Sequence, residues 1–187
     1  MADADEDVVS GIAQRGRNLL ADEVIGLIER RDTTEDPGVP RETLDAYADA
    51  LAERPNFDVD PEQFSGAIDE RLTDAENWAG TDTLYDLDGR ISAYPPAWHE
   101  ELGGSTDVEA YLTLVEEAST DSGEESLDTG TGEGVSEEWL LDAVTTVGRV
   151  KRDEAKEALE AARSEGQIDE GPDQHPGAGV RIAERDE

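Results

Sequence analysis

Basic side chains cluster in one short segment of an otherwise acidic chain. Five of the 15 Lys and Arg residues lie in this segment: Arg149, Lys151, Arg152, Lys156 and Arg163. Only four carboxylates lie among them, so residues 149–163 carry a net charge of +1 in a chain of -34. Such cations can contact DNA phosphates, and an Arg can pair bidentately with guanine. The segment is therefore the candidate DNA-binding site.

A second interpretation of the same residues is structural. On a solvated helix, Arg152 and Lys156 would form i, i+4 pairs with neighbouring carboxylates such as Glu157 and Glu160. We expect two of the five cations to be used in this way, which leaves three for a ligand.

The elements that position these cations are two predicted helices joined by a short turn. Ser136 is placed to cap the first helix, whose apolar stripe is Leu140, Ala143, Val144 and Val147, and Gly148 ends it. The second helix runs from about Arg152 to Glu165, with Gly166 as its stop. Two strands, 167–169 and 180–182, follow, and a helix beginning near Val108 precedes the pair.

Three helices followed by a hairpin is the order of a winged helix. The segment from Val135 to Ala183 resembles the winged helix-turn-helix domains of archaeal regulators and the small C-terminal domain of archaeal minichromosome maintenance helicases. The resemblance implies that the turn and the start of the second helix approach DNA. It does not imply helicase activity, because the chain has no ATP-binding loop. The acidic, Gly- and Ser-rich insertion at 119–134 departs from a compact winged helix.

The first half repeats the same order of elements. Helices are predicted from Arg17 to Arg30, after Pro40, and from Asp60-Pro61 onward, followed by a hairpin whose Asp88-Gly89 turn suits type I′. The segment 38–44 also parallels 134–140, which suggests an internal duplication. The predicted fold is therefore mostly α with short β-hairpins, in two winged-helix-like three-helix units.

The predicted domains are a disordered acidic lead at 1–10, an N-terminal domain at 11–104 and a C-terminal domain at 105–187. The helix of the first domain that would correspond to a recognition helix, Pro61 to Ala75, carries only one cation, Arg71, against four carboxylates. Phosphates would repel so acidic a helix. We expect this domain to bind a protein partner, to form a homodimer, or to be structural.

The overall composition indicates adaptation to salt. The chain has 49 Asp and Glu residues, and only two of its cations are Lys. This pattern resembles proteins of salt-in halophilic archaea, since at about 1 M salt a Debye length of roughly 3 Å screens most charge repulsion. An acidic disordered protein is the alternative, which the regular helical spacing of apolar residues disfavours. With no Cys, no long apolar run and no signal peptide, we expect a cytoplasmic protein that does not enter a membrane.

No residue pattern indicates an enzyme, a metal site or a cofactor. His99 and His175 lie far apart in the sequence, and the acidic stretch 82–89 lacks the spacing of a calcium loop. The three tryptophans, Trp78, Trp98 and Trp139, are expected to anchor a core or an interface. The sequence thus predicts a non-enzymatic, transcription- or replication-associated protein that binds double-stranded DNA. The alternative is a non-catalytic protein-interaction subunit of a regulatory, replication or repair complex.

Overall fold

The computed structural model describes residues 3–15, 21–31, 36–55, 57–79, 83–121, 135–170 and 179–183. The chain divides into two compact units. Unit 1 comprises residues 1–76 and 82–96, and unit 2 comprises 77–81 and 97–187. The expected boundary between residues 104 and 105 therefore falls inside unit 2. The fold is mostly helical with short β-strands, as the sequence predicts.

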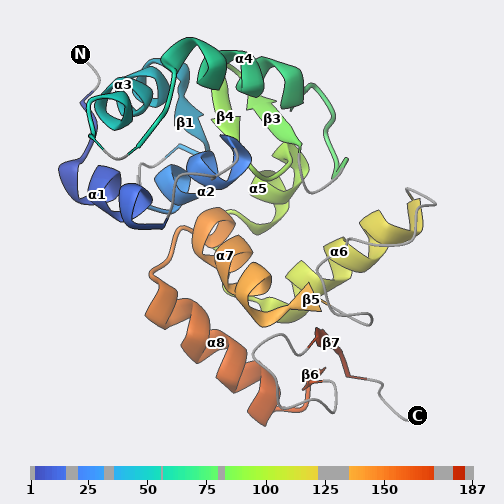
Figure 1. Ribbon diagram of the computed structural model, residues 1–187. Helices are drawn as coiled ribbons and strands as arrows, with labels where there is room; N and C mark the ends of the chain where they lie inside the picture. The colour runs from blue at the N-terminus through green and yellow to red at the C-terminus, as the bar shows by residue number, and fades with distance from the viewer. Residues whose placement is uncertain are drawn as a thin grey trace. The chain divides into compact units, whose positions relative to one another are not determined.

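Unit 1 contains four helices and a small sheet within its described residues (Figure 1). The helices are α1 (Glu6–Arg15), α2 (Ala21–Arg31), α3 (Arg41–Ala52) and α4 (Pro61–Arg71). The strands are β1 (Val39–Pro40), β2 (Leu72–Thr73), β3 (Leu84–Leu87) and β4 (Arg90–Ser92), in the sheet order β1-β4-β3-β2. The β2 strand, which runs parallel to β3, was not predicted from the sequence.

Local sequence explains how several of these elements begin and turn. The Asp60 carboxylate accepts hydrogen bonds from the backbone N–H groups of Glu62 and Gln63 and so caps α4, with Pro61 at the first helical position. Asp88 and Gly89 have φ values of 58° and 90°, which are the two positive values that a type I′ hairpin turn needs. Both predictions are confirmed.

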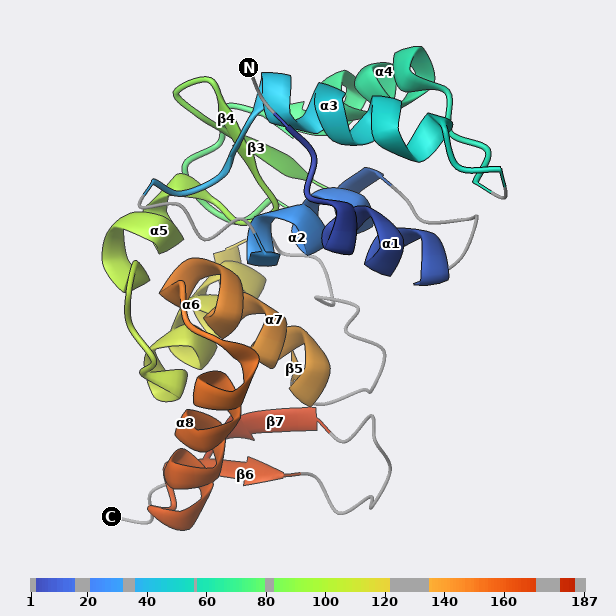
Figure 2. The same cartoon turned by 90° about the vertical axis from the view of Figure 1, so that its left-hand side faces the viewer.

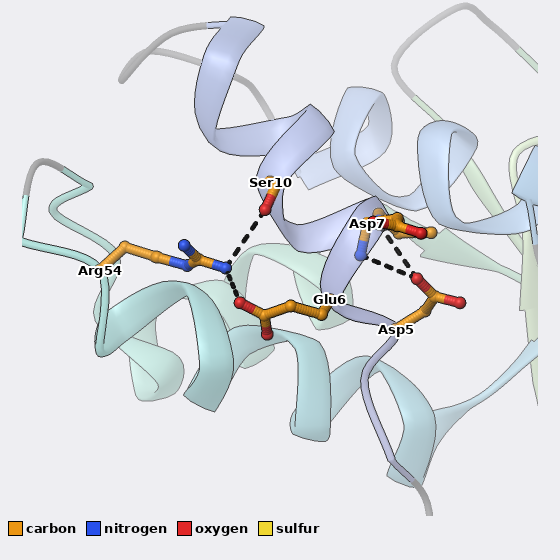
Figure 3. A network of polar contacts seen from close by, with 6 residues as sticks. Asp5, Glu6, Asp7, Ser10 and Arg54 are labelled. Atoms are coloured by element: carbon orange, nitrogen blue, oxygen red, sulfur yellow. Dashed lines mark hydrogen bonds and ion pairs between the residues drawn. The ribbon is translucent and has the colours of Figure 1, made fainter.

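The expectation of a disordered lead is wrong for residues 6–10, which open helix α1 (Figure 3). The Asp5 carboxylate accepts from the Asp7 backbone N–H at 2.9 Å and so caps the helix. Arg54, at the end of α3, pairs with Glu6 and donates to the Ser10 hydroxyl. Three apolar residues that follow the acidic ones, Val8, Val9 and Ile12, are buried in the core of unit 1. This apolar face stabilises the helix despite its acidic surface.

Unit 2 contains the helices α5 (Pro96–Leu102, in this unit from Ala97), α6 (Val108–Asp121), α7 (Glu137–Gly148) and α8 (Arg152–Ser164). Its strands β5 (Val135–Ser136), β6 (Ile168–Glu170) and β7 (Gly179–Ile182) form an antiparallel sheet in the order β5-β7-β6. Figure 2 shows β6 and β7 side by side next to α8. Since α6 continues to Asp121, the first three residues of the expected flexible insertion are helical, and 122–134 lie outside the described residues.

Both units share one arrangement of three helices and three strands, to which unit 1 adds β2. In each, a two-residue strand precedes the second helix of the three-helix set and pairs antiparallel with the last strand of the hairpin. Val39 in β1 and Val135 in β5 are buried at these equivalent positions. The segments 38–44 and 134–140, which parallel each other in sequence, occupy the same place in their units.

Candidate nucleic-acid interface

The turn between α7 and α8 is packed closely against the loop that joins α5 to α6. A methyl group added to Gly148 would lie 2.6 Å from the carbonyl oxygen of Ser105, so only glycine fits there. The Gly104 backbone N–H donates to the Val147 carbonyl at 3.3 Å. The end of α7 is thereby fixed on a neighbouring loop, and the direction in which α8 starts is fixed with it.

Arg149, the first of the predicted DNA-binding residues, caps α7 in the left-handed conformation, with φ 54° and ψ 43°. Its side chain returns toward the α5–α6 loop: a guanidinium nitrogen lies 3.1 Å from where a Cβ on Gly103 would stand. Burial and the nearby Arg149 charge lower the pKa of His99 to about 4. Burial raises the pKa of Tyr111, and the same guanidinium opposes that change.

Arg152 and Arg163 pair with carboxylates of α7. Arg152 donates to Asp142 at 2.7 Å, and Arg163 approaches Glu137 at 3.4 Å. Arg152 and Arg163 thus serve in ion pairs, which is the kind of structural use that the sequence interpretation expected for two of the five cations. However, their partners lie on α7 instead of one turn away on α8. These pairs join α7 to α8.

Lys151 and Lys156 differ from the three arginines. Both residues are exposed, and neither ammonium group has a hydrogen bond or ion pair with the residues that the structure describes. Lys151 is the N-cap of α8, where its backbone N–H donates to the Glu154 carboxylate at 3.0 Å. The chain's only two lysines therefore point to solvent on the first two turns of one helix.

Most of the other exposed charged residues of α8 are acidic. Asp153, Glu157 and Glu160 are all exposed, whereas Ala155 and Leu159 on the opposite side are buried. The start of α8 therefore combines cations with carboxylates, and the later turns present carboxylates. Phosphates would be attracted to the first part only.

The corresponding region of unit 1 keeps its cations in internal contacts. On α4, Arg71 lies 3.7 Å from Asp22 and donates to the Ala67 carbonyl. Arg41, at the start of α3, pairs with Asp69 at 3.0 Å and donates to Ser65. The exposed surface of α4 carries acidic residues, as expected.

The sequence does not predict two features of the structure, the clustering of the three tryptophans and the burial of Glu29. The three tryptophans, expected as core or interface anchors, gather in one cluster of unit 2: Trp78 stacks on Trp98 at 5.2 Å, and Trp139 meets both rings edge-on. In unit 1, the buried carboxylate of Glu29 accepts from the Ser92 hydroxyl at 2.5 Å and from the Ala93 backbone N–H at 3.0 Å. A glutamate in the last turn of a helix gives no sequence signal of burial.

Within the described part of the chain, no three His, Asp or Glu side chains are grouped so that they could hold a metal ion. His175 of the predicted wing lies outside the described residues. None of the described helices is long and apolar enough to span a membrane. Comparison with protein-family models, with curated proteins and with solved structures finds no match to this chain.

Proposed function

We propose that unit 2 binds double-stranded DNA through the first half of α8, and that the chain acts in transcription or replication in a cell with high internal salt. The single observation that carries the proposal is the placement of Lys151 and Lys156. A chain with 49 carboxylates and two lysines has both lysines exposed and unpaired, within the described residues, on the second helix of a helix-turn-helix. In such motifs this helix enters the major groove with its N-terminal residues against the bases.

The net charge of -34 does not exclude DNA binding. In molar salt the Debye length is about 3 Å, so distant carboxylates no longer repel phosphates. Local contacts then decide the interaction. A Lys that touches a phosphate still contributes, although its contribution falls as the salt concentration rises. Contacts with bases then gain in weight, and an Asp or Glu in the groove can accept a hydrogen bond from the cytosine amino group.

Fluorescence anisotropy with a labelled duplex, measured from about 0.3 to 3 M KCl, tests this proposal. The double variant Lys151→Gln plus Lys156→Gln should weaken binding at least tenfold. It should also reduce the slope of log K against log salt by about 1.8, since each phosphate contact contributes about 0.9. The control is Arg15→Gln plus Arg31→Gln, which removes two exposed cations from unit 1 and should leave both quantities unchanged.

Absence of binding by the unsubstituted chain at every salt concentration would overturn the proposal, and so would an equal loss in both double variants. The first result would favour a second function, that of a protein-interaction subunit of a regulatory, replication or repair complex. The exposed carboxylates Asp153, Glu157 and Glu160 on α8 support that function, because they suit a basic protein surface better than phosphate. Under either function, the acidic unit 1 would serve as a protein contact or a homodimer contact.

A further inference from the structure

The left-handed conformation of Arg149 is unusual for its position. Helices commonly end in this conformation, but the residue there is usually Gly, because a side chain costs about 1 kcal/mol or more. Unit 1 avoids the conformation at the equivalent turn: Glu53, which caps α3, has φ -75°. Because Gly would be less strained at this position, the presence of Arg indicates that its side chain makes a stabilising contact that compensates the strain.

The side chain of Arg149 makes that contact within unit 2. Its guanidinium lies over Gly103, and a Cβ on Gly103 would meet the His99 carbonyl oxygen at 2.4 Å. The His99 carbonyl therefore requires glycine at residue 103, and the absence of a side chain there lets the guanidinium approach the backbone closely. The Tyr111 hydroxyl completes the arrangement by donating to the Ser105 carbonyl at 2.9 Å.

We infer that Arg149 is a positioning residue of the helix-turn-helix and not a DNA contact: its guanidinium fastens the α7–α8 turn to the α5–α6 loop. Lys151, the N-cap of α8, follows two residues later. A turn held in this way determines the positions of Lys151 and Lys156. That Arg149 supports DNA binding through these lysines rests on the proposed function, whereas the contact of Arg149 with the α5–α6 loop does not.

The first test needs no DNA. Arg149→Gly keeps the left-handed backbone free of strain and removes only the side chain. Burial and the Arg149 charge together lower the pKa of His99 to about 4, so removal of that charge should raise the pKa, which NMR in KCl can follow. The matched control, Lys151→Gln, should leave this pKa unchanged. Tryptophan emission reports whether unit 2 stays folded, since the three Trp residues all belong to it.

An unchanged His99 titration in a folded Arg149→Gly variant would overturn the inference. So would a rise of equal size in the control. Because neither measurement involves DNA, they decide the place of Arg149 even if the proposed function fails.

The second test separates positioning from phosphate contact. In the duplex titration, Arg149→Gly should weaken binding several-fold while the salt slope keeps the value of the unsubstituted chain. A phosphate contact would instead lower the slope by about 0.9, as expected for each lysine. A reduced slope together with the full affinity loss of a lysine variant would make Arg149 a direct contact and refute the positioning role.

Discussion

Units 1 and 2 have the same order of strands and helices, apart from the additional β2 of unit 1, but they use their charged residues in opposite ways. At the first position of the second helix of each three-helix set, unit 1 has Arg41 and unit 2 has Glu137. Each pairs with the end of the following helix, Arg41 with Asp69 and Glu137 with Arg163. The same interhelical ion pair is therefore present with its polarity reversed.

This difference shows that a shared arrangement of helices and strands does not determine which cations are exposed without an ion-pair partner. In unit 1 the arginines of α3 and α4 are held by Asp69, Ser65 and Asp22. In unit 2, acidic residues on α7 hold Arg152 and Arg163, and the two lysines stay exposed at the start of α8. Of the described helices α4 and α8, only α8 thus presents cations to solvent without an ion-pair partner.

The units also differ in the ionisable group that each buries. Burial raises the pKa of Glu29 in unit 1 from 4.5 to about 7, although hydrogen bonds from Ser92 and from the backbone of Ala93, together with the charge of Arg30, act in the other direction. In unit 2, burial followed by the charge of Arg149 lowers the pKa of His99 from 6.5 to about 4. Proton binding therefore favours folding in unit 1 and opposes it in unit 2.

The largest expected effect is an opposite dependence of the two units on pH. The contribution of Glu29 is fully present below pH 4.5 and is lost as pH rises through 7, whereas that of His99 is present above 6.5 and is lost as pH falls through 4. Each contribution to the free energy of unfolding changes by roughly 3 kcal/mol across its pH range. Urea unfolding in KCl from pH 4 to 8 should show these opposite changes, with tryptophan emission for unit 2 and far-UV circular dichroism for both units.

Two substitutions test whether Glu29 and His99 cause these opposite pH dependences. Glu29→Gln should flatten the pH dependence of unit 1 between 4.5 and 7, and His99→Gln should do the same for unit 2 between 4 and 6.5. The control is Glu42→Gln, which changes an exposed glutamate and should alter neither pH dependence. If both units lost stability in the same pH direction, the contrast between their buried groups would be wrong.

A smaller effect should come from the ion pairs of reversed polarity. Arg41→Ala should lower the free energy of unfolding of unit 1 by about 1 kcal/mol, because Arg41 also donates to the Ser65 hydroxyl at 2.7 Å and to its carbonyl. Arg163→Ala, which breaks a 3.4 Å pair between half-exposed groups, should lower that of unit 2 by about half as much or less. Urea unfolding measures both.

The polarity itself can be exchanged. In unit 1, Arg41→Glu combined with Asp69→Arg reproduces the arrangement of unit 2 and should be more stable than Arg41→Glu alone. An equal stability of the double and the single variant would show that the ion pair contributes nothing and that the Ser65 contacts account for the whole effect of Arg41.

Much of the fold could be predicted because its signals are local. Apolar spacing, the caps Asp60 and Ser136 and the Asp88-Gly89 turn each act within a few residues, and all of them appear as expected. The α1 helix was missed because the acidic residues around Val8 suggested disorder. The unpredicted β2 is two residues long and depends on a partner strand distant in sequence.

The candidate site was harder to predict because its chemistry depends on partners across helices. Sequence spacing groups Arg149, Arg152 and Lys156 as equal cations. Their separate roles follow from Asp142 and Gly103, which lie 10 and more than 40 positions away in the chain. Burial of Glu29 likewise depends on Ser92, which is 63 positions away.

The smallest expected effect comes from Gly66, in the middle of α4. No atom would lie within 4 Å of an added Cβ, and the residue is helical, so Gly66→Ala should raise the free energy of unfolding of unit 1 by about 0.5 to 1 kcal/mol. The position faces solvent, as Glu157 does in α8. If only unit 2 docks on DNA, the duplex affinity of Gly66→Ala should equal that of the unsubstituted chain. A weaker affinity in this more stable variant would mean that α4 also approaches DNA, and the functional contrast between the units would fail.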